Sequence, residues 1–498
     1  MKYSNITLTG FICLSLLWSC DRPVRQELSP VGIWVSSPDT TNGVGESNWT
    51  TALLIGEGSG GNIVARGCFM WEGRYFNPWE VEQVSYNDSI RTLTLLDSDG
   101  DRYVGIADPG LQTIRGYFWS DDPDEDTPFD TVDFIRAESG LAQTLFYPRP
   151  PGTSGDPAYR YRQPETIGDG LRTADISTFG VDNSALHALL SQIISQDYGR
   201  LESLLVMKDS RLVLEEYYYG YDRTKKHNIH SCTKSIASLL LGIAMEQHRE
   251  VEVTHPVPGF FPEYDSLARD GKELLTLEHL LTMNSGFPAE DVPGWIDLDD
   301  QLLNILSRPL AQLPGTTFHY DNDNSILLGG ILQKITGKPP DVLAGQYLFG
   351  PMGISDCQWS YEDGLPQCHS DLHMLPRDMA KIGQLVLNDG TWEDQQLVPL
   401  EWIRESTRIH VAESEFFDYG YFWWHRSEGN KAWWDRPANG YSKEHEIILA
   451  LGFGGQYIMI IRDLNLVVVT TSSDYADGRT ARSKVPMVIE KLVPLFKQ

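Results

Sequence analysis

The sequence predicts an α+β protein in which a small antiparallel β-domain precedes a larger domain, itself an antiparallel sheet flanked by helices. Three observations lead to this prediction. Short alternating apolar runs broken by turn residues fill residues 32–140. Residues 141–168 are rich in proline and glycine and lack periodicity, which is typical of a linker. In residues 169–498, apolar strand pairs stand at both ends of a helical middle, as expected for one sheet assembled from distant segments.

The composition is that of a globular protein with several possible cores. The chain has 498 residues, of which 41% are hydrophobic and 11% aromatic. Its formal charge of -29 would repel phosphates, which argues against nucleic-acid partners and against binding an anionic membrane through surface charge. The oligomeric state does not follow from these numbers.

Residues 1–19 resemble the signal peptide of a bacterial lipoprotein. The apolar run GFICLSLLW is too short for a spanning helix and ends just before Cys20. In this resemblance LWSC corresponds to the lipobox, where cleavage leaves Cys20 as the N-terminus. The resemblance implies an exported protein, periplasmic or anchored to the outer membrane through a lipid on Cys20, with residues 20–31 as a tether. Trp18 is unusual in a lipobox, so a plain signal peptide and an uncleaved anchor are the alternatives.

Within the β-domain the pattern predicts about seven strands. The segment DSDGD resembles the start of a calcium loop. It lacks the closing glutamate and lies between strands, however, so a hairpin turn is predicted. Five tryptophans in this region are more typical of a barrel or sandwich core than of a sugar-binding platform: Trp34, Trp49, Trp71, Trp79 and Trp119.

The larger domain is expected to begin with a helix near residues 184–196 and two strands around a KDSR turn. Helices with loops are predicted over about 276–389, including one near 300–310. The segment HEIILALGFGGQYIMIIRDLNLVVVTTSSD predicts two strands around an RDLN turn, and a helix over 485–497 closes the chain.

The segment HSCTKSIASLLLGIAMEQ places Ser231 and Lys234 three residues apart at the start of an almost wholly apolar helix. Residues i and i+3 share one face of a helix, so the lysine amine can reach the serine hydroxyl. Burial can lower the pKa of a lysine enough for it to act as a base. A helix cap followed by a surface lysine would explain the same four letters, and the motif alone is weak.

Two further segments could complete an acyl-transfer site. In PGTTFHYDNDNSILLGGIL, Tyr320 could exchange protons with the serine if its pKa were lowered by a nearby ammonium, and Asn322 could hold Lys234 or a substrate amide. Tyr320 as a buried structural tyrosine is the simpler alternative.

The other segment, LGFGGQ, places glycines at the start of a strand. Glycines in a strand often mark a close approach to the backbone. The N–H groups of Ser231 and of a residue near Phe453 could bind an oxyanion there. A bulge or tight packing is the alternative. The candidate residues of this element are Gly452, Phe453, Gly454 and Gly455.

In this order and spacing the three motifs resemble the serine β-lactamase and penicillin-binding-protein superfamily, in its class C-like branch, over about residues 169–498. The resemblance implies a β-lactamase/transpeptidase-like catalytic domain with a mixed α/β lobe and a helical lobe. It also implies that Ser231 is the acyl-enzyme nucleophile, Lys234 the base or its partner, and Tyr320 the proton shuttle, with no metal or organic cofactor.

The third motif departs from class C β-lactamases, which carry Lys-Thr-Gly there. The GFGGQ segment has no lysine or histidine to bind a β-lactam carboxylate. It is closer to the esterase and aminohexanoate-dimer hydrolase members, whose resemblance implies small-molecule or peptide-like ester or amide substrates. A D-alanyl peptide or β-lactam processing enzyme is one alternative. An inactive scaffold used as a binding lipoprotein is the other. Aromatic residues of YGYFWW, with Trp433 and Trp434, are expected to wall the cleft.

Four cysteines follow the signal region. Export would permit a disulfide between Cys357 and Cys368, which could close a local loop. Cys232 is expected to be a packed thiol, and His369 and His373 ordinary loop histidines. No spacing of cysteine and histidine suggests a zinc site.

Overall fold

A computed structural model describes most of the chain, namely residues 29–36, 49–57, 62–71, 74–79, 81–98, 100–119, 130–146, 148–149, 161–288, 300–412, 417–426, 445–475 and 478–496. The predicted signal peptide, its LWSC motif and Cys20 lie outside these residues, as do Trp433 and Trp434. No helix in the described ranges is long and apolar enough to cross a membrane.

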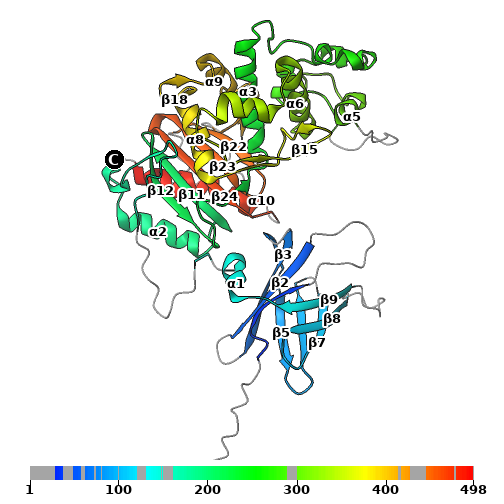
Figure 1. The fold of residues 1–498 in the computed structure, drawn as a ribbon, viewed down its shortest axis with the longest axis vertical. Coiled ribbons are helices and arrows are strands. Elements are labelled where there is room, and N and C mark those ends of the chain that lie inside the picture. The colour runs from blue at the N-terminus through cyan, green and yellow to red at the C-terminus, as the bar shows by residue number, and fades with distance from the viewer. Residues whose placement is uncertain are drawn as a thin grey trace, which may run out of the picture.

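The N-terminal unit is one antiparallel sheet of nine strands, in the order β4-β3-β2-β1-β9-β8-β7-β6-β5. The first strand pairs with the last, which curls the sheet into a nearly closed, barrel-like form (Figure 1). The sequence predicts a barrel or a sandwich, and a single curled sheet is the barrel-like form. The strands are β1 (Gly32–Ser36), β2 (Trp49–Glu57), β3 (Ile63–Trp71), β4 (Arg74–Trp79), β5 (Val81–Asn87), β6 (Thr92–Asp97), β7 (Arg102–Ala107), β8 (Thr113–Trp119) and β9 (Asp130–Arg136).

The interior of this sheet is filled by alternate side chains, as the period-2 pattern predicts. Trp34 is fully buried and Trp79 almost so, whereas Trp119 is half-buried. The DSDGD segment is the turn between β6 and β7, closed by the Asp97 amide donating to the Asp101 carbonyl. The hairpin prediction is therefore confirmed.

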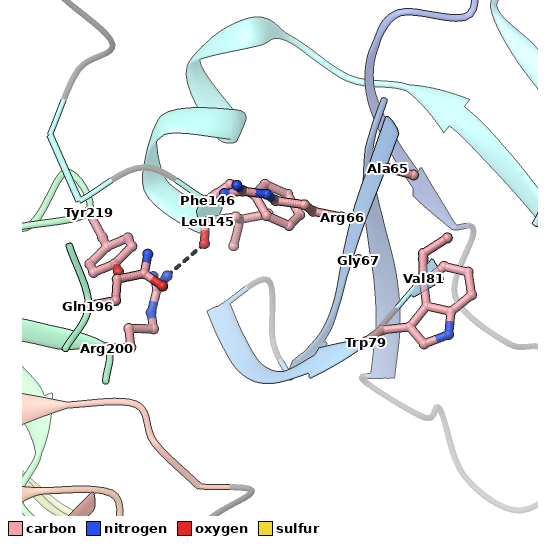
Figure 2. Close-up of a pocket in the computed structure, with 10 residues that line it drawn as sticks. All are labelled: Ala65, Arg66, Gly67, Trp79, Val81, Leu145, Phe146, Gln196, Arg200 and Tyr219. Carbon is pink, nitrogen blue, oxygen red and sulfur yellow. Dashed lines mark hydrogen bonds between the residues drawn. The ribbon is translucent and has the colours of Figure 1, made fainter. Parts of the chain in front are cut away.

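Helix α1 (Ser139–Phe146) joins the two units and spans the predicted boundary between the β-domain and the linker. Its apolar side packs on the outer face of the barrel against Ile33 and Met70. The Leu145 carbonyl accepts a hydrogen bond from Arg200 of the larger unit at 2.6 Å (Figure 2). The Thr144 carbonyl accepts a second one from the same guanidinium at 2.8 Å. A cavity of about 410 Å³ lies beside this contact and is lined from both units.

The larger unit contains an eight-stranded sheet in the order β10-β12-β11-β24-β23-β22-β21-β20. Its neighbours are antiparallel apart from the parallel pair at one edge, β10 with β12. Its strands come from both ends of the domain sequence, as predicted: β10 (Arg172–Thr173), β11 (Leu201–Lys208), β12 (Arg211–Tyr217), β20 (Asp418–Tyr419), β21 (Trp424–Arg426), β22 (Ile447–Gly452), β23 (Gln456–Ile461) and β24 (Leu466–Ser472). The predicted α+β class is confirmed.

Both faces of this sheet are covered. Alternate residues of β11 enter different cores: Leu204 packs toward α2 (Asn183–Ile194) and the C-terminal segment, and Leu205 toward α3 (Cys232–Gln247) and α8 (Pro376–Leu387). The C-terminal segment runs as α11 (Lys484–Met487), a π-helical turn and a 3-10 turn to Phe496, which interrupts the single closing helix predicted.

The middle of the domain is helical, as predicted, and packs against α3 (Figure 1). Its helices are α4 (Leu277–Leu281), α5 (Gln301–Ser307), α6 (Asn322–Thr336) and α7 (Pro340–Ala344), with α9 (Leu400–Ser406) and α10 (Gly478–Arg482) later in the chain. Short strands fill the connections: β13 (His227–Asn228), β14 (Gln358–Trp359), β15 (Tyr361–Glu362), β16 (Leu365–Pro366), β17 (Leu372–Met374), β18 (Thr391–Trp392) and β19 (Gln395–Gln396).

One detail of the prediction is wrong. The glycines of LGFGGQ do not open a strand. Gly452 ends β22, and Gly454 and Gly455 lie in the turn to β23, so the C-terminal region supplies three strands rather than two. The sequence leaves open whether Cys357 and Cys368 form a disulfide, and in the structure both are free thiols.

Candidate active site

Ser231 is the residue immediately before α3, and Lys234 lies in the first turn of that helix. The i, i+3 spacing brings the lysine Nζ to 3.1 Å from Ser231 Oγ. Every residue of α3 from Cys232 to Ala244 is buried, which explains the almost uninterrupted apolar run. The Cys232 thiol is packed, as predicted, and donates to the Gln456 carbonyl at 3.1 Å.

Lys234 is 1% exposed, and two neutral oxygens accept hydrogen bonds from its Nζ. Asn322 Oδ1 lies at 2.8 Å and the His369 carbonyl at 2.9 Å. Burial lowers the pKa of Lys234 to about 7, with the nearby Asp321 acting in the opposite direction. A substantial fraction of the amine is therefore neutral at physiological pH.

These contacts orient the lone pair of the neutral amine. A neutral lysine has two N–H bonds, and Asn322 and His369 supply one acceptor for each. The lone pair is then left for the third neighbour, the hydroxyl of Ser231 at 3.1 Å. This arrangement suits a base that takes the serine proton.

Tyr320 precedes α6 and is brought to the same place from about ninety positions along the chain. Its ring lies 5.0 Å from Lys234 Nζ and stacks on Trp424 at 5.4 Å between centroids. Burial raises the pKa of Tyr320, opposed by a hydrogen bond with Ser231. The expectation of a lowered phenol pKa is therefore wrong, because desolvation of the phenolate outweighs its partners. At neutral pH Tyr320 is a proton donor.

The LGFGGQ turn packs directly against the segment that carries the nucleophile. A Cβ atom on Gly452 would lie 2.3 Å from the carbonyl oxygen of Ile229, two residues before Ser231. Gly454 has a φ of 78°, and a Cβ there would lie 2.3 Å from the ring of Tyr475. The glycines thus permit tight packing within the protein, which was the alternative for this segment, and Phe453 between them is 55% exposed. Binding of an oxyanion at this turn stays a prediction.

Sequence reasoning missed three residues at this site. The His369 carbonyl is an acceptor for Lys234, although His369 was expected to be an ordinary loop residue. The rings of His230 and Tyr475 contact each other and Phe453, and His230 Nε2 lies 3.4 Å from the Tyr475 hydroxyl. A backbone carbonyl has no sequence signature. His230 adjoins the nucleophile, and that adjacency was the one available signal.

Two aromatic residues of the YGYFWW segment, Tyr419 and Trp424, pack beside Tyr320. Both contribute to the core, and Tyr419 is 1% exposed. That this segment walls a substrate cleft stays a prediction. Within the described ranges no group of three His, Cys, Asp or Glu side chains could hold a metal ion.

The sequence of residues 200–486, more than half of the chain, matches the family model described as "Beta-lactamase". The chain belongs to the β-lactamase family. This family-matched region contains Ser231, Lys234, Tyr320 and the glycine turn, and it makes the chain a member of a serine hydrolase superfamily.

Relatives within this superfamily carry hydrolase names at low identity. The chain is 27% identical to Esterase EstB of Burkholderia gladioli over 28% of this chain and 42% of the esterase. It is 22% identical to the 6-aminohexanoate-dimer hydrolase of Paenarthrobacter ureafaciens over 55% of this chain and 72% of that enzyme.

A solved structure from Bacteroides dorei, described as a "putative beta-lactamase", has the same fold. It aligns with a TM-score of 0.51 at 19% identity, covering 64% of this chain and all of that one.

Proposed function

We propose that this β-lactamase-family protein cleaves an ester or amide bond through an acyl-enzyme on Ser231. The observation that carries the proposal is the hydrogen-bonding of Lys234. Its two neutral acceptors and lowered pKa leave a lone pair facing the serine hydroxyl at 3.1 Å.

In the proposed reaction, Lys234 accepts the proton of Ser231 as the serine oxygen bonds to the substrate carbonyl carbon. The N–H groups of Ser231 and Phe453 would stabilise the oxyanion. Tyr320, which is protonated at neutral pH, then donates its proton to the leaving oxygen or nitrogen as that bond breaks. The proton returns to Tyr320 from Lys234, and water hydrolyses the acyl-enzyme by the reverse sequence.

The absence of a basic residue in the glycine turn favours substrates without a carboxylate at this position. The third motif is GFGGQ, and its exposed side chain is the apolar Phe453. An ester or amide is therefore preferred over a β-lactam or D-alanyl peptide, whose carboxylates need a cationic partner. The class C-like branch follows the same order of motifs and is part of the proposal.

Mass spectrometry after treatment with a fluorophosphonate tests the nucleophile. We expect a single adduct on Ser231, no adduct in Ser231→Ala, and loss of p-nitrophenyl ester turnover in the same variant. Ser235→Ala is the matched control, because Ser235 lies one turn further along α3 and donates to the Phe422 carbonyl instead. Turnover that persists in Ser231→Ala would overturn the proposal. A stable benzylpenicillin adduct on Ser231 would favour the cell-wall alternative.

Export and lipid anchoring at Cys20 are part of the proposal and are supported by the N-terminal sequence pattern alone. We expect the protein from a bacterial membrane fraction to begin at Cys20 and to carry a lipid. Cys20→Ser should release it from the membrane. An N-terminus at Met1 in the mature protein would contradict this.

A further inference from the structure

A second cavity, of about 520 Å³, lies in the larger unit away from Ser231. Four segments meet there: residues 170–172 at the start of β10, the end of β11 with its turn to β12, the C-terminal end of α8, and the β18–β19 hairpin. Leu171 and Met207 supply apolar wall, and Trp392, at 7% exposure, lines the same space. Its volume is within the range of small-molecule sites.

This cavity is at the opposite end of the central sheet from the catalytic turn. Leu201, at the start of β11, pairs with Ser472, and the glycine turn packs beside Ser472. Strand β11 then runs for eight residues before the turn that carries Ser210. At about 3.3 Å per residue, roughly 25 Å separate the two ends, so the cavity is not part of the candidate active site.

Gln384 of α8 lines the cavity with an unpaired polar atom. Its side chain is 3% exposed, and its Nε2 donates to Ser210 Oγ at 3.2 Å and to Asn388 Oδ1 at 2.9 Å. Its Oε1 is buried and has no hydrogen-bond partner among the residues the structure describes. An unpaired buried carbonyl costs about 1–3 kcal/mol, so a donor that enters the cavity would be favoured.

The other lining groups indicate which class of ligand could supply this donor. Ser210 and Asn388, with Thr391, offer a hydroxyl, an amide and a second hydroxyl within one cavity. The exposed lining residues carry charges of both signs, from Arg172, Glu393 and Asp394. Neither a simple anion nor a simple cation is selected, and an apolar ligand would leave Gln384 unpaired.

We propose that this cavity binds a neutral saccharide of about disaccharide size. Sugar hydroxyls both donate and accept, so one can donate to Gln384 Oε1 while a neighbour accepts from the Asn388 amide. Another can donate to Thr391 Oγ1, whose own proton is donated to Gln396 Oε1. The exposed part of the Trp392 indole is small, at 7%, and can contact a C–H group of the sugar ring. This ligand site is independent of the proposed hydrolysis.

Saturation-transfer NMR on the full chain tests the site, with cellobiose, maltose and N,N′-diacetylchitobiose as probes at millimolar concentration. We expect binding of at least one probe, weakened about tenfold or more in Gln384→Leu, which corresponds to about 1.4 kcal/mol. Gln395→Leu is the matched control, because Gln395 lies on the adjacent β19 and is exposed. Fluorophosphonate labelling of Ser231 should be unchanged in both variants, which checks folding.

Asn388→Ala provides a second variant in case Gln384→Leu does not fold, since Asn388 is exposed at the end of α8. It should also weaken binding. Failure of all three disaccharides to bind would overturn the proposal and indicate a water-filled cavity. If wild type, Gln384→Leu and Asn388→Ala bound the sugar equally well, the sugar would bind outside this cavity and the proposal would be overturned. If glycylglycine bound in a Gln384-dependent way and no disaccharide bound, the saccharide proposal would be overturned. The ligand class would then be a zwitterionic peptide.

Discussion

Two buried lysines of the larger unit have different partners, and the difference separates a candidate base from a structural cation. Lys484 is fully buried and forms an ion pair with Asp474, with the Thr480 carbonyl as a further acceptor at 3.0 Å. Lys234 is as deeply buried, yet its hydrogen-bond acceptors in the described chain are an amide oxygen and a peptide carbonyl, beside the Ser231 hydroxyl.

Burial disfavours the charged form of any lysine, and a carboxylate partner offsets that penalty. Lys381 follows the Lys484 pattern, with Asp378 at 2.8 Å. Among the described residues, the acceptors of Lys234 include no carboxylate, and burial lowers the pKa of Lys234 to about 7. Burial alone therefore does not identify a base. Lys272 is also buried, donates to the Leu306 carbonyl and has a lowered pKa. The Ser231 hydroxyl beside Lys234 is therefore the further feature that distinguishes Lys234.

The comparison is tested most strongly by replacing each lysine with methionine. Lys234→Met should reduce kcat/KM for p-nitrophenyl esters by about 10³-fold, because the general base is lost, with little change in unfolding temperature. Lys484→Met should instead lower the free energy of unfolding by about 3 kcal/mol, because Asp474 is left without its cation. Steady-state kinetics and thermal unfolding of both variants measure these effects. The reverse pattern would contradict the assignment.

Lys234→Arg separates charge from basicity. A guanidinium stays protonated across the physiological range, so it cannot accept the serine proton, and kcat should fall about 10²-fold. Lys484→Arg, which keeps the cation beside Asp474, should lose much less activity per folded molecule. The concentration of folded protein, measured by absorbance and near-UV circular dichroism, normalises both rates. An active Lys234→Arg enzyme would show that Lys234 acts only as a cation.

The pH dependence of the wild-type enzyme should follow Lys234. Its pKa of about 7 means that the amine is protonated below pH 7 and cannot accept a proton. Activity is therefore lost as pH falls, and kcat/KM should drop about tenfold per pH unit below that value. A profile of kcat/KM from acid to mildly alkaline pH, with stability checked at each point, gives this limb. A flat profile across pH 7 would be inconsistent with a titrating base.

Asn322→Asp converts the Lys234 site toward the Lys484 pattern. The substitution is nearly isosteric and places a carboxylate where the amide oxygen lies 2.8 Å from Nζ. The acidic limb should move up by at least about one pH unit, with about tenfold less activity at pH 7. Asn183→Asp, at the start of α2, adds the same charge far from Lys234 and should leave the limb in place. If the acidic limb of the pH profile did not shift in Asn322→Asp, the hydrogen-bond acceptors of Lys234 would not determine its pKa.

Much of the fold could be predicted because its patterns are local. Alternation along the N-terminal strands and the apolar run after Ser231 each reflect burial of a whole face, which the sequence displays directly. The glycine turn was misplaced because a run such as ILALGFGGQYIMII is apolar on both sides, and a strand and a tight turn between two buried strands look alike. Barrel closure depends on pairing β1 with β9, about a hundred residues apart.

The candidate site shows the same division. The sequence by itself determined that Ser231 and Lys234 share one helix face, since helical spacing is a property of neighbouring residues. Tertiary structure alone decided that Lys234 meets the Asn322 amide and the His369 carbonyl rather than a carboxylate, and that burial raises the pKa of Tyr320. Desolvation and the choice of acceptor depend on chain segments about a hundred positions away, and no local pattern records them.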